Sequence, residues 1–226
     1  KWDFNPTPTE LISLTAFYKL IKNPISRIEV ASAGGYLSYE NIADKATVAG
    51  VEVEVRKNLF VRPLSSAANG MNKLSFGLNG SYIYTNAKMP LATVTTGSQL
   101  EGAAPWIANF DLSHNFTKGN HSFINTLVFN YVSDKIYTIG TQGYQDIIEQ
   151  GMMTLDFVSQ AKLNKYVSLT LKARNLLNPS YKLSRKANES GEKVVLSDYK
   201  KGINISLGVS CRSPDAWFPL CLPYKS

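Results

Sequence analysis

The sequence is poor in cysteine, in charge and in long hydrophobic runs. Of 226 residues, 2 are cysteine and 18% are charged. Cys211 and Cys221 are too few for a disulfide framework and, without other ligands, too few for a thiolate metal site. Ser, Gly, Asn and Thr interrupt the longest uncharged stretch, residues 74–87, so no segment supplies the roughly 20 mostly apolar residues of a membrane-spanning helix. A disulfide-stabilised miniprotein and a helical membrane protein are therefore excluded.

The chain also lacks the organised basic patch of a nucleic-acid-binding protein, although its formal net charge is +7. Its cations are scattered between apolar segments and gather in one region only, which contains Lys182, Arg185, Lys186, Lys193, Lys200 and Lys201. No RNA-binding aromatic signature or zinc-finger spacing accompanies them, so we expect no nucleic-acid partner. The chain starts at Lys1 with no initiator Met and no signal sequence, so we expect a piece of a longer protein.

Apolar residues alternate with polar ones along most of the chain, and alternation places residues i and i+2 on one face of a β-strand. The four clearest apolar faces are Ile12/Leu14/Ala16/Tyr18/Leu20, Ala49/Val51/Val53/Val55, Leu74/Phe76/Leu78/Tyr82/Tyr84 and Trp106/Ala108/Phe110/Leu112/Phe116. Four weaker ones are Phe123/Leu127/Phe129/Tyr131, Leu155/Phe157/Ala161, Val167/Leu169/Leu171/Ala173 and Ile203/Ile205/Leu207/Val209. The pattern predicts about eight strands and an all-β fold.

These strands are unusually long and carry charge in unusual places. Each spans about 10–13 residues, whereas strands of soluble domains most often have about 5–6, and a tilted strand needs about 9–11 to cross a bilayer. Glu52, Glu54, Arg56 and Asp111 lie in mid-strand, on the face opposite the apolar one. A water-filled interior accommodates such charges, so the pattern favours a transmembrane β-barrel.

The connections alternate between short and long. Tight-turn sequences join strands at 117–120 and 163–166, and a middling connection of about 58–72 falls on the same side. The long connections are about 22–44, 87–103, 137–150 and 178–199. Transmembrane barrels have short periplasmic turns and long extracellular loops. Aromatic residues near the expected strand ends fit interfacial girdles, and ordinary core packing is the alternative. These residues are Tyr18, Tyr82, Tyr84, Trp106, Phe116, Tyr131 and Tyr166.

Four segments carry a resemblance to a known family. They are LTAFYKLIKNPI (14–25), NIADKATVAGVEVEVRKNL (41–59), LEGAAPWIANFDLSH (100–114) and ARNLLNPSYKLSRKANESGEKVVLSDYKKGINISLGVS (173–210). In this order and spacing they resemble the C-terminal barrel of TonB-dependent outer-membrane receptors of the Bacteroidetes type.

The resemblance implies an antiparallel transmembrane β-barrel segment: about the last eight strands, residues 1–210, of a twenty-two-stranded barrel. It further implies an N-terminal plug outside this chain, energy from the TonB complex, and uptake of an iron–siderophore complex, haem, cobalamin or a glycan. Outer-membrane lipid, lipopolysaccharide and a surface lipoprotein are the expected partners. Family members usually end at the last strand, so residues 211–226 form an atypical tail, within which Cys211 and Cys221 could close a small loop.

Ligand contacts are expected in the long loops, because loops on a rigid scaffold carry binding residues. The candidates are Tyr36, Tyr39, Tyr137, Gln142, Tyr144 and Tyr181, with loop-to-loop packing as the alternative. The cations Lys182, Arg185, Lys186 and Lys193 could instead neutralise phosphates of lipopolysaccharide. This hypothesis predicts salt-sensitive binding of lipid A.

We expect no enzyme, cofactor or metal. Glu52 and Glu54 project from one face about 7 Å apart, a separation that a glycosidase pair could use, but the far better explanation is two lumen carboxylates balanced by Arg56. His114 and His121 do not fit a shared metal. Two alternatives stay open beside a receptor fragment: a complete eight-stranded outer-membrane barrel acting as an anchor or adhesin, and a soluble β-sandwich carbohydrate-binding module.

Overall fold

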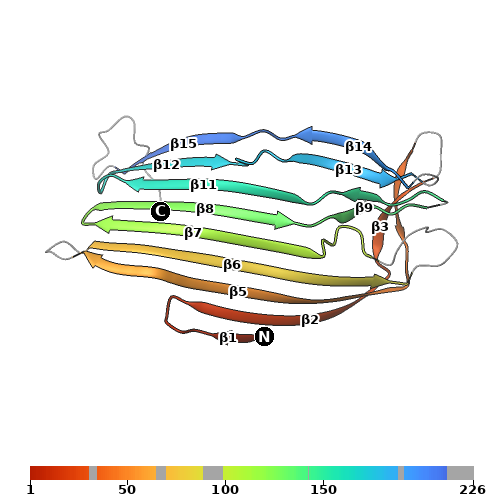
Figure 1. Cartoon of the computed structure of the whole chain (residues 1–226), viewed down its shortest axis with the longest axis horizontal. Coiled ribbons are helices and arrows are strands. Elements are labelled where there is room, and N and C mark those ends of the chain that lie inside the picture. The colour runs from red at the N-terminus through yellow and green to blue at the C-terminus, as the bar shows by residue number, and fades with distance from the viewer. Residues whose placement is uncertain (31–34, 65–69, 89–98, 142, 188–190, 213–226) are drawn as a thin grey trace.

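All regular structure in the described part of the chain is β-strand (Figure 1). The computed structural model describes residues 1–30, 35–64, 70–88, 99–141, 143–187 and 191–212. Its strands are β1 (Trp2–Phe4), β2 (Leu11–Lys22), β3 (Ile25–Glu29), β4 (Leu37–Asn41), β5 (Lys45–Leu64), β6 (Gly70–Ala87), β7 (Trp106–Lys118), β8 (His121–Val132), β9 (Lys135–Thr138), β10 (Ile147–Glu149), β11 (Met152–Lys162), β12 (Val167–Arg174), β13 (Ser180–Lys186), β14 (Lys193–Lys200) and β15 (Asn204–Cys211). Among these residues there is no helix of the length and apolarity needed to traverse a membrane.

Nine strands form one antiparallel sheet, which we call the wall. Their order is β1-β2-β5-β6-β7-β8-β11-β12-β15. β1 has three residues, and the other eight are the eight long strands that the alternation predicts. The all-β antiparallel fold is therefore confirmed. β5 and β6, with 20 and 18 residues, exceed the expected length, and β12 and β15, with 8 residues each, fall short of it.

The expected connection at 58–72 is wrong, because most of it is paired strand. β5 and β6 remain in register down to the pair Leu64↔Gly70. A register shift between Asn58 and Phe60 interrupts the alternation, and Pro63 weakens the strand signal further. Only residues 65–69, which lie outside the described part, separate the two strands, so this connection belongs with the short turns.

The register gives the wall one apolar face and one polar face. Residues that pair directly in an antiparallel ladder lie on the same face. One row reads Val55, Leu78, Phe110, Phe129 and Leu155 across β5, β6, β7, β8 and β11. The next row, on the opposite face, reads Glu54, Asn79, Asn109, Asn130 and Thr154. Amides in the polar row are linked across strands, Asn109 to Asn79 at 3.4 Å and Asn130 to Thr154 at 3.2 Å.

The apolar face runs obliquely across the wall. Its end nearest the short turns is Ile12 on β2 and Val209 on β15. Ile12 is level with Phe129 on β8, and Val209 is level with Phe123 on the same strand. Six residues of strand, about 20 Å, are thus traversed over seven strand spacings of about 4.8 Å, a slope of about 30°. Strands of membrane barrels are tilted by about 35–45°, which is close to this slope.

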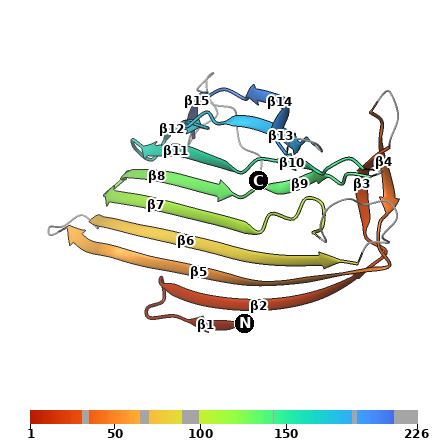
Figure 2. The same cartoon turned by 45° about the vertical axis from the view of Figure 1, so that its right-hand side comes forward.

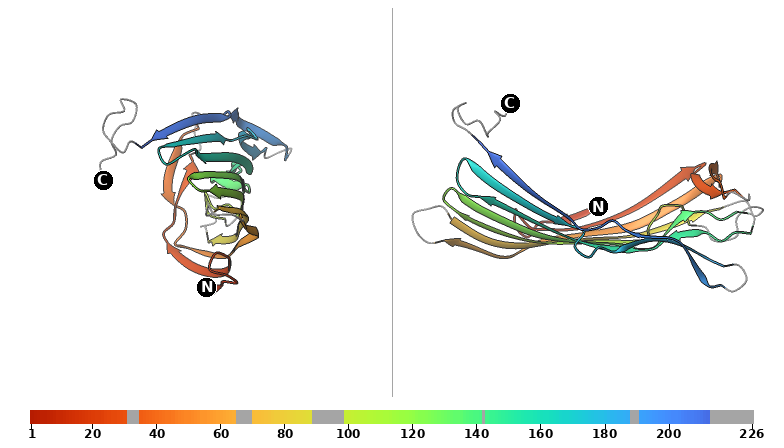
Figure 3. Two further views of the ribbon diagram at one scale, coloured as in Figure 1. Left: turned by 90° about the vertical axis from the view of Figure 1, so that its left-hand side faces the viewer. Right: turned by 90° about the horizontal axis from the view of Figure 1, so that it is seen from above.

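The wall is curved and open (Figure 3). β1 and β15 form its two edges in the described residues, so these residues do not close into an eight-stranded barrel. The main contacts of the wall strands are with their neighbours in the same sheet, which is unlike the face-to-face packing of a β-sandwich.

The long connections gather at one end of the wall and contain paired strands that the sequence reading took for loops. β3 pairs with β4, and a four-stranded sheet has the order β14-β13-β10-β9. In Figure 2 the β3–β4 hairpin stands across the direction of the wall strands. We call these two small sheets, with residues 99–105, the mouth layer. Its hydrophobic core is Ile28, Ile42, Ile136 and Ile139, with Ile148 packed against it.

Candidate functional site

The mouth layer is joined by a short parallel bridge between β3 and the residue after β9. The Ile139 amide donates to the Arg27 carbonyl at 3.0 Å, and the Glu29 amide donates to the Ile139 carbonyl at 3.2 Å. The Thr141 hydroxyl also donates to the Glu29 carbonyl at 2.5 Å. Ile139 is fully buried. The first and third long connections therefore share one backbone network and one core.

Arg27 is the centre of one cluster in this layer. Glu101 accepts from the Arg27 backbone amide at 2.5 Å and pairs with its guanidinium at 3.4 Å. The guanidinium also lies over the rings of Tyr137, at 4.3 Å from the centroid, and Tyr39, at 5.9 Å. Burial disfavours the charged arginine, but Tyr137 and Glu101 outweigh this and raise the pKa of Arg27 above its ordinary value. Residues from three long connections thus meet at one cation.

A second cluster ties the fourth long connection to the first. Arg185 on β13 forms a salt bridge with Glu29 on β3, and both side chains are 16% exposed. The Arg185 guanidinium also lies 5.4 Å from the ring centroid of Tyr144. Water screens a partly buried ion pair less than an exposed one, so this contact joins β13 to the β3–β4 hairpin.

A third cluster surrounds Tyr181. Its ring lies 5.0 Å from that of Tyr199, and its hydroxyl is hydrogen-bonded to Glu149. Glu149 also pairs with Lys135 at 3.2 Å. Burial, followed by the negative charge of Glu149, raises the pKa of Tyr181 to about 12. Tyr181 therefore remains a neutral donor at physiological pH.

The predicted ligand residues fall into separate groups. Tyr39 and Tyr137 meet at Arg27, Tyr144 lies beside Arg185, and Tyr181 lies in the third cluster. Tyr36 and Tyr39 are 70% and 66% exposed, so their rings are available to a ligand. Gln142 lies outside the described residues. Sequence reasoning missed Arg27, Glu29, Glu101 and Glu149, which organise these groups.

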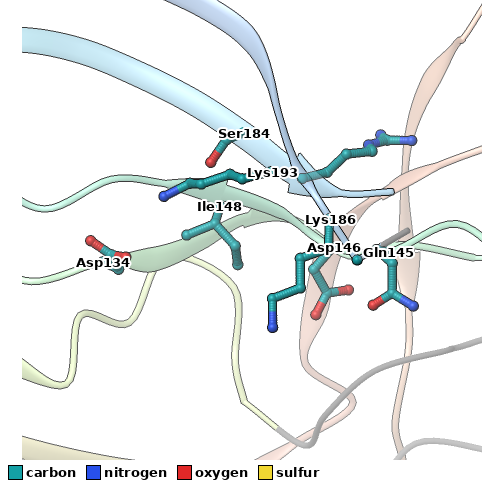
Figure 4. Close-up of a pocket in the computed structure, with 9 residues that line it drawn as sticks. Asp134, Gln145, Asp146, Ile148, Ser184, Lys186 and Lys193 are labelled. Atoms are coloured by element: carbon teal, nitrogen blue, oxygen red, sulfur yellow. The ribbon is translucent and has the colours of Figure 1, made fainter. Parts of the chain in front are cut away.

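A pocket of about 370 Å³ opens between the third and fourth long connections (Figure 4). Its lining combines acids, bases and one apolar side chain: Asp134, Gln145, Asp146, Ile148, Ser184, Arg185, Lys186, Gly191 and Lys193. The acids also support the backbone, because Asp146 accepts from the Gly140 amide at 2.8 Å and Asp134 from the Gly151 amide at 2.5 Å. The pocket is thus polar, of mixed charge and built on hydrogen-bonded loops.

The four cations predicted to contact lipopolysaccharide have different surroundings. Lys182 pairs with Asp198 at 3.1 Å, and Arg185 is held by Glu29. Lys186 and Lys193 pair directly across the β13–β14 hairpin and line the pocket. Arg185, Lys186 and Lys193 thus line one pocket, and Lys182 is paired outside it.

The polar face of the wall carries the charges that the sequence places in mid-strand. Glu54 pairs with Arg56 at 2.7 Å, and both line an open hollow of about 360 Å³ with Asp111. Glu52 pairs in register with Ser81 and is exposed. His114, on the apolar face, is hydrogen-bonded to Asn72 at 2.8 Å. In the described residues no three His, Cys, Asp or Glu side chains are arranged to hold a metal ion.

A sequence model described as TonB dependent receptor-like, beta-barrel matches residues 1–176. The chain belongs to this family of TonB-dependent receptor barrels. No curated protein and no solved structure matches it. The match covers the wall from β1 to β12, and the two-faced, tilted sheet is what a barrel segment requires.

Membership of this family indicates the general function. TonB-dependent receptors are transporters of the outer membrane, not enzymes, and they work with the TonB complex. In a transmembrane barrel the apolar face of the wall meets lipid and the polar face lines the lumen, so we call these two faces the lipid face and the lumen face. In such barrels the short turns lie at the periplasmic rim and the long loops at the extracellular rim.

Proposed function

We propose that this chain forms barrel wall and extracellular surface of a Bacteroidetes-type TonB-dependent transporter for a scarce nutrient. The nutrient classes are an iron–siderophore complex, haem, cobalamin or a glycan. A plug outside this chain would transmit energy from the TonB complex. The observation that carries the proposal is the wall itself, whose apolar and polar faces separate in register over at least five strands.

The aromatic side chains of the mouth layer are the proposed ligand contacts. Tyr36 and Tyr39 offer exposed rings, and Arg27 fixes Tyr39 beside Tyr137. Rings held by a rigid cation contact lose little conformational freedom on binding, and exposed aromatic faces suit sugars and macrocycles. Tyr144, Tyr181 and Gln142 belong to the same proposal.

The experiment uses the complete reading frame that contains this chain. Expressed in its host, the protein should fractionate with the outer membrane and change its electrophoretic mobility on heating, as folded barrels do. Of labelled ferric siderophore, haem, cobalamin and oligosaccharide, one should be taken up. That uptake should require both this protein and TonB. Recovery in the soluble fraction, or uptake unaffected by deletion of the gene, would refute the proposal.

A paired substitution tests the ligand contacts. In Y36A/Y39A the apparent affinity for the nutrient should fall by about tenfold or more, because aromatic hot spots contribute about 2 kcal/mol or more. Y166A is the matched control, since Tyr166 is an exposed tyrosine near a short turn. Equal losses in both variants would remove the mouth tyrosines from the ligand site.

Lipopolysaccharide contact is proposed for Lys182, Arg185, Lys186 and Lys193. Because Arg185 also supports the mouth layer, the sharper variant is K186Q/K193Q. Lipid A binding should weaken in this variant and lose most of its salt dependence. Unchanged binding would eliminate the two lysines as contacts. A surface lipoprotein is the remaining proposed partner. It should co-purify with the receptor when the receptor is isolated from membranes in mild detergent.

A further inference from the structure

One row of the lipid face is polar on three adjacent strands. His114, Asn125 and Ser159 pair in register across β7, β8 and β11. The Ser159 hydroxyl donates to Asn125 Oδ1 at 2.7 Å, and His114 Nε2 bonds Asn72 Oδ1 at 2.8 Å. These four residues, which we call the polar notch, form two hydrogen-bonded pairs on a face that is otherwise mostly apolar.

Apolar side chains border the polar notch on both sides. Phe116 and Phe123 lie one row closer to the short turns than His114 and Asn125, level with Asn72, and their ring centroids are 6.5 Å apart. Toward the middle of the wall lies the row Leu112, Leu127 and Phe157. Adjacent rows on one face are about 7 Å apart along a strand. A chain running along the wall from the short turns would thus meet aromatic, polar and then apolar rows.

The polar notch lies where the membrane interface is expected. A straight line across the wall from Ile12 on β2 to Val209 on β15 marks the limit of the apolar face and crosses this row between β8 and β11. At that depth a bilayer changes from acyl chains to ester and phosphate groups. The ester region is rich in hydrogen-bond acceptors and contains no strong donors.

The polar notch has donors to spare. Asn72 and Asn125 use their carbonyl oxygens within the two pairs, and the Nδ2 groups of both make no hydrogen bond within the described residues. Leaving amide donors unpaired against hydrocarbon is costly. The partner that would satisfy them must supply acceptor oxygens on the lipid side of the wall.

The adjoining short turns are cationic. Arg62, Lys73, Lys118, Lys162 and Lys165 lie at the short-turn ends of β5–β12, and residues 59–64, 70–75, 114–125 and 159–170 contain no Asp or Glu. Lys118 is exposed, pairs with His121 and is two residues beyond Phe116, so it continues the lipid face into the headgroup region. A lysine there complements a phosphate.

We propose that the polar notch and Lys118 bind one glycerophospholipid of the periplasmic leaflet. Lys118 contacts the phosphate, the amides of Asn72 and Asn125 donate to the ester oxygens, and the acyl chains lie along Leu112 and Leu127. The inference rests on the proposed outer-membrane orientation, in which the short turns are periplasmic. It adds to that proposal a specific lipid site on the outside of the barrel, remote from the mouth.

The first test compares lipid retention by the complete receptor, purified in mild detergent, using native mass spectrometry. Phosphatidylglycerol and phosphatidylethanolamine are the probes. N72L/N125L and K118Q should each weaken retention of one lipid by about tenfold, the effect of losing one or two membrane-level hydrogen bonds. N86L is the matched control, because Asn86 lies on the same face at the opposite end of β6. Retention equal to the control would overturn the site.

The second test does not depend on a stable variant. The unmodified receptor is reconstituted with phosphatidylglycerol that carries a photoreactive diazirine near the ester groups. Crosslinks should concentrate on residues 112–127, and crosslinks spread evenly over the lipid face would overturn the inference. In native membranes, a benzoylphenylalanine at position 123 should capture lipid, and capture of a protein instead would assign the polar notch to a protein partner.

The two proposals fail in different ways. If the receptor is recovered in the outer membrane with heat-dependent mobility but shows no site-dependent lipid retention, only the lipid site is refuted. If it is not recovered there, the proposed function fails with it.

Discussion

Arg27 lies with its guanidinium 4.3 Å from the ring centroid of Tyr137 and at the same time pairs with Glu101. One side chain therefore links three long connections that are far apart in the sequence. Its pair with Glu101 is 22% and 17% exposed, so water screens it less than the mouth pair between Lys182 and Asp198, which is 37% and 42% exposed.

E101Q should loosen the mouth layer. Removing one partner of a partly buried charge pair costs about 1–3 kcal/mol, because the remaining arginine loses its charged acceptor. Hydrogen exchange of residues 25–29 and 135–138 should speed up correspondingly. K182Q is the control, with an expected cost below about 1 kcal/mol. Equal protection in E101Q and the unmodified protein would contradict the central role of Arg27.

Tyr181 should titrate abnormally late. Its pKa is raised to about 12 by burial and Glu149, from an ordinary value of 10.0. A raised folded-state pKa stabilises the fold fully below the unfolded value, and the contribution is lost as pH rises from about 10 to 12. The tyrosinate absorbance of Tyr181, identified as the absorbance present in the unmodified protein and absent in Y181F, should therefore appear near pH 12. In E149Q it should appear closer to pH 10, and an unchanged titration would contradict the contact.

Asn175 should be replaceable by glycine more readily than by alanine. It has a φ of 58°, its amide donates to Asp156 at 2.8 Å, and its side chain donates to the Gly202 carbonyl at 2.7 Å. N175G loses only the side-chain hydrogen bond, which costs about 1 kcal/mol of stability. In N175A the alanine must also adopt the left-handed backbone conformation, which costs about 1–2 kcal/mol more. Urea unfolding of the complete protein in detergent measures the difference. A reversed order would show that the turn conformation is unimportant.

A side chain at Gly77 should displace the Asp111 carboxylate, which lies opposite. A Cβ at Gly77 would collide with the Asp111 carboxylate, whereas a Cβ at Gly80 would meet only the Ile107 carbonyl oxygen at 3.9 Å. G77A should cost about 1 kcal/mol or less, because the Asp111 carboxylate is the free end of a flexible side chain beside an open hollow, and G80A should cost less still. In the double variant G77A/D111A the cost should be smaller than the sum of the two single costs. Additive costs would mean that the two residues do not touch.

The wall was predictable because a strand with one face toward lipid and the other toward water must alternate apolar and polar residues. Ile12, Val55, Leu78 and Phe110 stand out in the sequence and are level in the sheet. At Asn58–Phe60 the register shift breaks the alternation, so the continuation of β5 was mistaken for a connection.

The mouth layer was not predictable in the same way. Its strands are short, and β9 has four residues, too few for a period to show. The partners Arg27 and Glu101 are 74 residues apart, and neither stands in a pattern that announces the other. Tyr39 and Tyr137 were chosen as loop aromatics, but only the fold reveals the cation between them.

The two ends of the wall are held by different means. At the short turns, the described contacts run between neighbouring strands of the sheet. At the other end, the Glu29–Arg185 pair joins the β2–β5 connection to the β12–β15 connection, which arise from opposite sides of the nine-stranded sheet, and the Arg27–Glu101 pair joins the first of these to the β6–β7 connection. The mouth layer therefore acts as a brace that fixes the spacing of distant strands at the outer rim. Among the described residues, no ion pair joins distant strands at the short-turn end.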